Sequence, residues 1–275
     1  MIPSFEVKVD GVLIPYRLIQ FSGGELHVQL DTSNYIEDTD EAFELNIETL
    51  QYPMTLMTEL SLLRNALQKV FPITMDYLTL PYVPYGRQDR VCSEGDAFSL
   101  EVFAKQLNAL EFDKVFITDP HSDVTPALIN NCNITTQLDI MILNSRFLDN
   151  YSHVVSPDAG AYKKVQGIAG YFNKEVIPCL KTRDTSTGRL SNTVVITQEV
   201  KEEVTSIVVL DDICDKGGTF IPLAQKLREA YPNARLDLFV THGIFAAGTH
   251  NLKEHYDNLY CHNLFNKGLE VEVIQ

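Results

Sequence analysis

The sequence predicts an α/β fold with mostly parallel sheets flanked by helices, and three observations indicate it. Short apolar runs rich in β-branched residues alternate with amphipathic helical patterns, as in βαβ units. Polar residues of catalytic type follow several of these runs, at the strand ends where open α/β sheets bind ligands. The chain has 275 residues and 45% hydrophobic content, which is enough for two ordinary domains with full cores.

The apolar runs and helical patterns can be placed along the chain in order. Strands are expected over 77–80, 115–118, 154–156, 176–180, 207–210 and 236–241, and helices over 55–70, 99–110, 161–172 and 220–230. The pattern weakens between Asn130 and Asn144. We therefore expect two domains, an N-terminal one over 1–135 and a C-terminal one over 136–275.

Composition excludes some partners and favours a compartment. The formal net charge is −15 and the sequence pI is about 4.8, which argues against a nucleic-acid groove or an anionic membrane surface as the main partner. The five cysteines are far apart and form no C-x-x-C motif, so reduced thiols in the cytoplasm are expected. No apolar run approaches the length of a membrane span.

The segment 207–220 is the most informative part of the chain. Asp211 and Asp212 follow a buried apolar run, and two adjacent carboxylates suit hydroxyl donors or a cation. Gly217, Gly218 and Thr219 then precede a helix, where backbone N–H groups can bind an anion. Together these features suit a phosphorylated sugar. The alternative is a plain strand-to-helix turn with glycines for geometry and aspartates for capping.

A second segment, 80–90, combines two prolines, two tyrosines and a glycine before Arg87 and Arg90. Prolines fix the backbone, so the guanidinium groups can be held in place for phosphate or an aromatic base. The alternative is a surface loop with an Arg–Asp ion pair.

These segments resemble a known family. Segment 207–220 resembles the phosphoribosyl-diphosphate (PRPP) loop of type I phosphoribosyltransferases and PRPP synthetases, with Lys216 where threonine is usual. Segment 85–90 resembles the Tyr-(Gly/Ala)-Arg-Gln-Asp-Arg element of ribose-phosphate diphosphokinases, which are the PRPP synthetases. Further matches follow in family order at 21–25, 118–123, 155–160, 181–183 and 241–245. The resemblance implies two phosphoribosyltransferase-like domains with the active site between them.

The resemblance implies Mg²⁺-dependent transfer of diphosphate from ATP to the 1-hydroxyl of ribose 5-phosphate, which gives PRPP and AMP. It assigns ribose-phosphate binding to Asp158, Asp211, Asp212, Asp215, Lys216, Gly217, Gly218 and Thr219. It assigns metal contacts to His121 and Asp158, although a lone histidine more often has a capping or core role. ATP would bind through Phe21, Glu25, Arg87, Gln88 and Asp89.

Lys181 and Arg183 are expected just beyond the strand 176–180, where they would stabilise the charge that develops during transfer. The polar stretch 184–192 would form a mobile lid. The alternative is two solvated cations on a disordered loop. Because Phe21 and Glu25 would reach the ATP base of a neighbouring subunit, a homo-oligomer is expected. Gly23 stands where the family has aspartate, which removes one expected adenine contact.

Two other functions stay open at this point. A type I phosphoribosyltransferase would share the 211–219 loop but consume PRPP, and it would not need the Arg87 segment. A non-catalytic regulatory subunit would only bind partner subunits. The candidate catalytic and metal residues argue against this function, because such a subunit would not require them.

Overall fold

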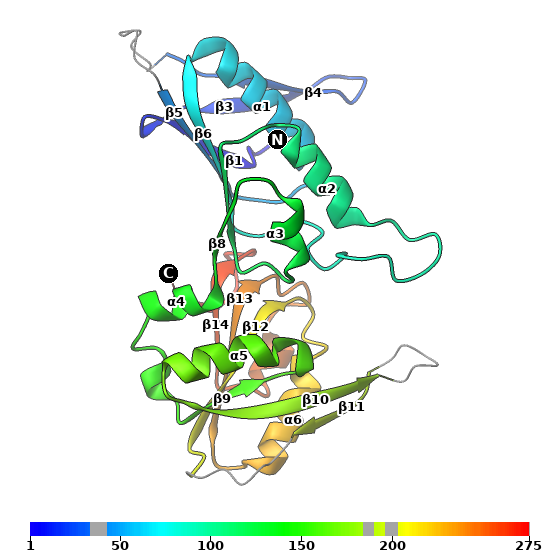
Figure 1. The fold of residues 1–275 in the computed structure, drawn as a ribbon, viewed down its shortest axis with the longest axis vertical. Coiled ribbons are helices and arrows are strands. Elements are labelled where there is room, and N and C mark those ends of the chain that lie inside the picture. Colours follow the sequence, from blue (N-terminus) through cyan, green and yellow to red (C-terminus); the bar gives the residue numbers. More distant parts are fainter. Residues whose placement is uncertain (34–42, 184–189, 196–202, 275) are drawn as a thin grey trace. The chain divides into compact units, whose positions relative to one another are not determined.

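The computed structural model describes residues 1–33, 43–183, 190–195 and 203–274. The chain divides into two compact units, Met1–Thr135 and Thr136–Gln275, and each is described by itself (Figure 1). These are the ranges that the sequence analysis assigns to two domains. The ligand roles of the two domains stay predictions.

Unit 1 contains a six-stranded sheet in the order β2-β1-β5-β6-β7-β8 and a separate β3–β4 hairpin. Strands β5 to β8 pair in parallel, and β1 pairs antiparallel with both β2 and β5. The elements are β1 (Phe5–Val9), β2 (Val12–Leu13), β3 (Tyr16–Gln20), β4 (Leu26–Leu30), β5 (Phe43–Thr49), α1 (Leu56–Val70), β6 (Ile73–Leu80), α2 (Ser99–Asn108), β7 (Lys114–Thr118), α3 (Val124–Leu128) and β8 (Cys132–Thr135).

The core of unit 1 lies on one face of its sheet. Along β5, buried residues alternate with exposed or half-buried ones, and the register places Ile47 beside Leu78 of β6 and Val7 of β1. These side chains share one hydrophobic cluster with the buried faces of α1 and α2. On the opposite face Met75 and Phe116 are exposed. Such alternation is expected when one side of a sheet is covered.

A buried carboxylate joins three elements of unit 1. Glu59 of α1 is fully buried and accepts hydrogen bonds from the backbone N–H of Ser4 (2.7 Å), the Ser4 hydroxyl (2.6 Å) and the Tyr16 hydroxyl (2.6 Å). Burial and the neighbouring carboxylate raise the pKa of Tyr16. The network fixes the start of β1 and the β3–β4 hairpin to α1.

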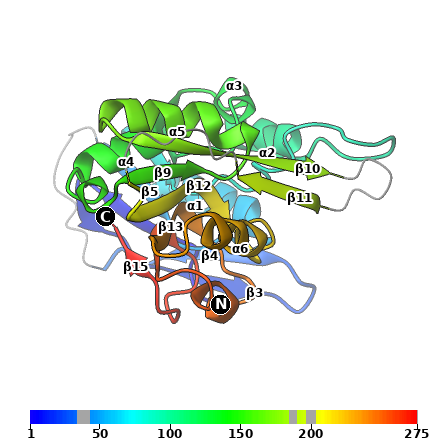
Figure 2. The same cartoon turned by 90° about the horizontal axis from the view of Figure 1, so that it is seen from below.

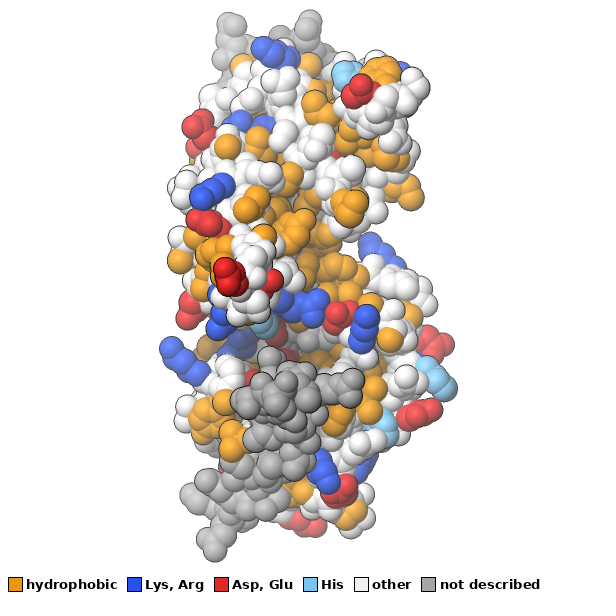
Figure 3. Space-filling model, turned by 90° about the vertical axis from the view of Figure 1, so that its right-hand side faces the viewer, with side chains coloured by type: hydrophobic (Ala, Val, Ile, Leu, Met, Phe, Trp, Pro, Cys, Tyr) orange, Lys and Arg blue, Asp and Glu red, His pale blue; other side chains and the backbone are white. Residues whose placement is uncertain are grey.

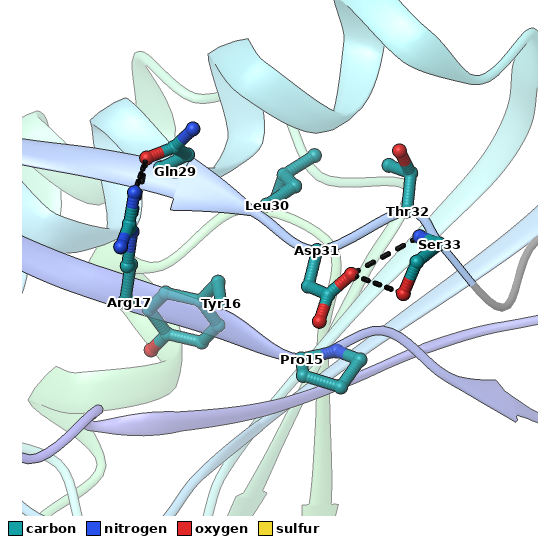
Figure 4. A pocket seen from close by; sticks show the side chains of 8 residues that line it. All are labelled: Pro15, Tyr16, Arg17, Gln29, Leu30, Asp31, Thr32 and Ser33. Carbon is teal, nitrogen blue, oxygen red and sulfur yellow. Dashed lines mark hydrogen bonds between the residues drawn. The ribbon is translucent and has the colours of Figure 1, made fainter.

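The β3–β4 hairpin carries a pocket of about 550 Å³ (Figure 4). Arg17 donates across the hairpin to Gln29 (2.9 Å), and Asp31 accepts from the backbone and hydroxyl of Ser33. Among the described residues, this pocket is lined by positions 15–17 and 29–33. None of these is a predicted site residue, so the pocket is not the predicted site.

Unit 2 contains a seven-stranded sheet in the order β11-β10-β9-β12-β13-β14-β15. β10 and β11 pair antiparallel, and the pairs from β10 through β15 are parallel. The elements are α4 (Gln137–Leu143), η1 (Leu148–Asn150), β9 (His153–Ser156), α5 (Ala159–Tyr171), β10 (Glu175–Arg183), β11 (Leu190–Val195), β12 (Ser206–Cys214), α6 (Phe220–Ala230), β13 (Arg235–Gly243), α7 (His250–Lys253), β14 (Asn258–Leu264) and β15 (Glu272–Val273).

The sheet of unit 2 is covered on both faces, so its central strands are buried on both sides. Val209 of β12 belongs to a cluster with α6, whereas the neighbouring Val208 and Leu210 belong to a cluster with α4 and α5. Figure 2 shows α5 and α6 on opposite sides of the β12–β13 region. Consecutive buried residues along β12 and β13 follow from this double burial.

The structure contains every strand and helix that the sequence predicts, but two strands near the predicted site extend further than predicted. β10 continues past residue 180 to Arg183, because β11 pairs with it through Arg183↔Leu190. β12 continues past residue 210 to Cys214, because it pairs with β13 through Cys214↔Gly243. Lys181 and Asp211 therefore lie within strands and not beyond them. The sequence analysis missed the strands β1 to β5, β8, β11, β14 and β15 and the helices α3, α4 and α7.

Charged and apolar side chains mix on the surface. On the face in Figure 3, acidic and basic side chains of the described residues are interspersed with hydrophobic ones. Among the described residues, no helix has the length and apolar character needed to span a bilayer.

Candidate functional site

In unit 2, three predicted carboxylates gather at the carboxyl ends of the neighbouring strands β9 and β12. Asp158 follows β9 and caps α5, where its Oδ1 accepts from the N–H groups of Gly160 and Ala161 (both 3.0 Å). The Asp211 carboxylate accepts from the backbone N–H of Asp212 (3.0 Å). Asp158 therefore caps α5 with one carboxylate oxygen, and its predicted ligand role stays a prediction.

Burial and charge repulsion distinguish this cluster. The pKa of Asp211 lies well above its ordinary value, first because the carboxyl is buried, then because of the Asp212 carboxylate and, more weakly, that of Asp158. The negative charge of the cluster would be relieved by sugar hydroxyls that donate hydrogen bonds or by a divalent cation. This chemistry fits the ligands that the sequence predicts.

The loop after β12 needs glycine at one position. Gly217 has φ +79°, and a Cβ there would lie 3.1 Å from a side-chain carbon of Leu252. Its carbonyl accepts from the first N–H groups of α6, those of Phe220 (3.0 Å) and Ile221 (2.9 Å). Gly218 is exposed and has no such restriction. The loop therefore turns sharply into the start of α6, with Thr219 at the N-cap position.

The loop is also attached to the segment after β13. The N–H groups of Ile244 and Phe245 donate to the Cys214 carbonyl (3.0 and 3.1 Å), and that of Ala246 donates to the Asp215 carbonyl (3.0 Å). Phe245 is buried with φ +46°, a conformation that costs energy for a residue with a side chain. The backbone from Cys214 to Asp215 is therefore held on one side by this strained turn.

In unit 1, the structure brings together the Arg87 segment and the His121 segment. They follow the neighbouring strands β6 and β7, and a Cβ on the buried Gly86 would lie 3.8 Å from the Cβ of His121. Arg87 and His121 are exposed, while Tyr85 (φ +63°) and Asp119 (φ +39°) have left-handed backbone conformations. Backbone strain of this kind gathers at functional sites.

Asp89 contacts a different arginine from the one that the sequence analysis emphasises. It is buried, and its carboxylate accepts from Nε of Arg90 (2.8 Å) and again from the same guanidinium (3.1 Å). This pairing is the largest cause that holds the pKa of Asp89 below its ordinary value, against the opposing effect of burial. The predicted orientation of Arg87 and Gln88 by Asp89 remains a prediction. The Gln88 carbonyl accepts from the N–H of Leu100 in α2 (3.3 Å).

Phe21 and Glu25 lie in the tight turn of the β3–β4 hairpin. The Phe21 N–H donates to the Glu25 carbonyl and the Gly24 N–H donates to the Phe21 carbonyl, both at 2.9 Å. The Phe21 ring is 56% exposed, so it is no core residue of its unit. A Cβ on Gly23 would lie 2.5 Å from the Glu25 carboxylate. The adenine contact of these residues stays a prediction.

Lys181 and Arg183 lie on the backbone of β10, opposite Thr193 and Leu190 of β11. Their side chains lie outside the described part of the structure, as do residues 184–189 of the predicted lid. The end of the predicted lid, from Leu190, belongs to β11.

The predicted metal residues, His121 and Asp158, belong to different units. Within the described residues, no group of three or more His, Cys, Asp and Glu side chains could hold a metal ion. Asp211 and Asp212 offer adjacent carboxylate oxygens of the kind that Mg²⁺ prefers, but they do not form such a group of three with Asp158.

The sequence analysis missed Gln137 at this site. Its fully buried amide donates to the Asp211 carbonyl (2.6 Å) and to the Thr241 hydroxyl (3.0 Å). The local sequence gives only a capping box, in which Thr136 and Asp139 cap the start of α4. No signal in the sequence links position 137 to residues 74 and 104 positions away.

Comparison with known proteins gives a consistent result. The chain is 28% identical to the ribose-phosphate pyrophosphokinase of Pyrococcus abyssi over 254 residues, covering 88% of this chain and 81% of the relative. It is 27% identical to the enzyme of the same name from Pyrococcus furiosus over 247 residues, covering 88% and 83%. A relative with this name from Corynebacterium glutamicum is 26% identical, covering 87% and 72%. No protein-family model matches the chain.

The fold agrees with these sequence relatives. The chain resembles the crystal structure of phosphoribosylpyrophosphate synthetase from Mycobacterium smegmatis with a TM-score of 0.69 and 20% identity, covering 92% of this chain and 81% of that one. The likeness to this structure confirms the predicted α/β fold with mostly parallel sheets. The chain is therefore similar over most of its length to ribose-phosphate pyrophosphokinases in sequence, and to a phosphoribosylpyrophosphate synthetase in fold.

Proposed function

We propose that this chain catalyses the Mg²⁺-dependent transfer of diphosphate from ATP to ribose 5-phosphate. The 1-hydroxyl oxygen attacks the β-phosphorus, the bond from the β-phosphorus to the α,β-bridging oxygen breaks, and AMP leaves as the hydroxyl loses its proton. The products are PRPP and AMP. The observation that carries the proposal is the acidic cluster beside a glycine-dependent loop at the carboxyl ends of β9 and β12, in a chain with these relatives.

The cluster and the loop suit the two ends of the pentose phosphate. Asp211 and Asp212 would accept hydrogen bonds from the ribose hydroxyls, and Asp158 would lie beside them. The backbone from Asp215 to Thr219 would wrap the 5-phosphate, because a sharp turn before a helix can direct N–H groups at an anion. Lys216 would add a positive charge there.

Unit 1 would supply the nucleotide contacts. The exposed Arg87 and Gln88 would bind ATP, and the buried Asp89 would hold Arg90 beside them. Phe21 and Glu25 would contact adenine of a neighbouring subunit. His121 and Asp158 would hold Mg²⁺, which neutralises phosphate charge when bound. A homo-oligomer and a cytoplasmic location belong to the same proposal.

The chemical step needs positioned cations more than covalent catalysis. Lys181 and Arg183, two residues apart on the extended strand β10, would stabilise the charge on the transferring group. Lys181→Ala should lower kcat about 100-fold, a loss of about 3 kcal/mol of transition-state stabilisation. The matched control is Lys226→Ala in α6, where the lysine pairs with Glu229 on the surface. Equal turnover of the Lys181 variant and the wild type would contradict the assigned role.

One assay tests the reaction itself. The purified chain is incubated with Mg²⁺, ATP labelled at the β-phosphorus and ribose 5-phosphate, without any base. We expect the label in PRPP and an equal amount of AMP, loss of both with excess chelator, and recovery with added Mg²⁺. Formation of a nucleotide from PRPP and a free base, with no AMP from ATP, would identify a phosphoribosyltransferase. Absence of Mg²⁺-ATP binding by calorimetry would favour a non-catalytic subunit.

A further inference from the structure

A buried amide lies against the acidic cluster from a part of the chain distant in sequence. Gln137 is the first residue of α4, and its side chain has no exposed surface. Its Nε2 donates to the Asp211 carbonyl and to the Thr241 hydroxyl, while its Oε1 has no partner among the described residues. Burying an amide with an unpaired oxygen costs stability. The two donated hydrogen bonds offset part of that cost.

The amide bridges two neighbouring strands of the sheet, beyond the last pairing of β12 with β9. β9 pairs with β12 as far as Val155↔Val209, two residues before Asp211, whereas β12 pairs with β13 from Ser206↔Arg235 to Cys214↔Gly243. Gln137 contacts both β12 and β13 in this part of the sheet, at Asp211 and Thr241.

The Asp211 carbonyl and the Asp212 N–H belong to the same planar peptide group. Gln137 holds the carbonyl at 2.6 Å, and the Asp211 carboxylate accepts from the N–H at 3.0 Å. Loss of the Gln137 bond would let this peptide plane rotate. Because the Asp211 carboxylate accepts from the N–H of this peptide group, its direction would change with the plane.

We infer that Gln137 is a positioning residue for pentose binding: it fixes the peptide group between Asp211 and Asp212 and so sets the direction of the Asp211 carboxylate, which accepts from that peptide. The inference rests on the proposed function, which places the ribose hydroxyls at this pair. Gln137 itself touches no reacting atom. Its effect should therefore appear in the affinity for ribose 5-phosphate and not in the affinity for ATP.

Gln137→Met tests the inference, because methionine has a similar length and volume but donates no hydrogen bond. We expect its KM for ribose 5-phosphate to rise about tenfold, as for the loss of one to two hydrogen bonds, with the KM for ATP within about twofold of wild type. Thr241→Val removes one of the two acceptors and should raise the KM for ribose 5-phosphate about twofold to threefold. The valine variant decides the question if the methionine variant does not fold.

The matched control is Asp237→Asn. Asp237 is a fully buried residue of β13 near the other end of the same sheet, bonded to Tyr151 (2.6 Å) and to Asn258 (3.0 Å). This variant should lower the melting temperature but leave both KM values unchanged. Unchanged ribose 5-phosphate KM in Gln137→Met, or an equal rise in Gln137→Met and Asp237→Asn, would overturn the inference.

The inference and the proposed function can fail separately. An active wild type with an unaffected Gln137→Met variant refutes only the inference. If the wild type binds ribose 5-phosphate in calorimetry but forms no PRPP, the proposed reaction fails, and the Kd of the Gln137→Met variant for ribose 5-phosphate decides the inference by the same tenfold criterion. A wild type that binds no ribose 5-phosphate overturns both.

Discussion

The two units use parallel strands but bury them differently. β5 of unit 1 alternates buried and exposed residues over one core, whereas β12 and β13 of unit 2 lie between two cores. A strand with one covered face can carry charged residues such as Glu44 and Glu48 at every second position. A strand covered on both faces carries few, because each charge would lose its water; the buried Asp237 of β13 is paired with Arg235 and accepts from the Tyr151 hydroxyl. The acidic pair of unit 2 lies where this double cover ends.

The two units also differ in the charged neighbours of their buried aspartates. In unit 1 Asp89 has a guanidinium partner, and the Arg90 bond lowers its pKa. In unit 2 Asp211 has carboxylate neighbours, and burial together with Asp212 raises its pKa. The loop after β6 in unit 1 thus holds a carboxylate whose charge is stabilised, whereas β12 in unit 2 holds one whose charge is disfavoured. A carboxylate whose charge is disfavoured in this way suits a ligand that donates hydrogen bonds or carries positive charge.

The largest expected effect comes from the doubly covered strands. Phe239→Ala removes a fully buried ring from β13 and should cost about 3 to 5 kcal/mol of unfolding free energy in unit 2. Phe116→Ala, on the open face of unit 1 where the ring is 39% exposed, should cost less than about 1 kcal/mol. Urea unfolding measures both. Similar costs for the two variants would break the comparison of the units.

The buried carboxylate of unit 1 should have the next effect. Glu59→Gln keeps the shape but places an amide where Ser4 and Tyr16 donate to oxygen, so one donor faces another. We expect a loss of about 2 kcal/mol. Hydrogen exchange should show that β1 and the β3–β4 hairpin open more often than in wild type while unit 2 is unaffected. Equal loosening of unit 2 would contradict the separate anchoring.

A smaller effect is expected in the loop after β12. Gly217→Ala forces a left-handed alanine against Leu252 and should cost about 1 to 2 kcal/mol. Gly218→Ala is the matched control, because a Cβ there meets nothing within 4 Å, and its unfolding free energy should stay close to wild type. Thermal unfolding checks both. If both substitutions cost the same, the turn does not depend on the conformation of Gly217.

The pair Asp211 and Asp212 should give a smaller effect, which is a change in how steeply the free energy of unfolding depends on pH. Because the folded pKa of Asp211 is raised, the folded state binds more protons than the unfolded state above about pH 4, so stability falls as pH rises through the folded pKa. Asp212→Asn removes the charge that is the second cause of the shift. It should lower the pKa of Asp211 in a carboxyl NMR titration and flatten this fall. An unchanged titration would show that burial alone raises the pKa.

Asp89 should show the opposite sign and so sharpen the comparison. Its folded pKa is lowered, so its contribution to stability is present above about pH 4 and is lost as pH falls through the folded pKa. Asp89→Asn should reduce the loss of unit 1 stability in acid. Its melting temperature across the acid range, compared with wild type, measures this. Equal acid sensitivity in both proteins would mean that the Arg90 pair contributes nothing to folding.

The difference between the units also explains what the sequence could predict of the fold. The run 207–210 is apolar at every position and the run 236–241 at all but Asp237 and Thr241, because both faces are covered, so they are recognisable as buried strands. The missed strands β1 and β5 carry charges such as Lys8 and Glu44 at alternate positions. These strands with one covered face lack the continuous apolar runs by which a buried strand is recognised in sequence.

The candidate site was predictable where its residues lie close together in sequence or follow a strand. Asp211 and Asp212, the Gly217 loop and Asp158 are recognisable in this way, and the neighbouring strands β9 and β12 bring them together. Gln137 was not predictable, because its role depends on tertiary contacts with distant strands. An Arg–Asp ion pair in the 80–90 loop was the alternative at the level of sequence, and only the folded loop identifies its members as Asp89 and Arg90.

The strained turn at Phe245 has a mechanical consequence. Three consecutive N–H groups of this turn donate to the carbonyls of Cys214 and Asp215. The turn is also closely packed, because a Cβ on Gly243 would lie only 2.3 Å from the Phe245 ring. A displacement of the loop 215–219 must therefore move the backbone after β13 with it. If the loop binds the 5-phosphate as proposed, a spectroscopic probe near Ala246 would report that binding without contacting the ligand.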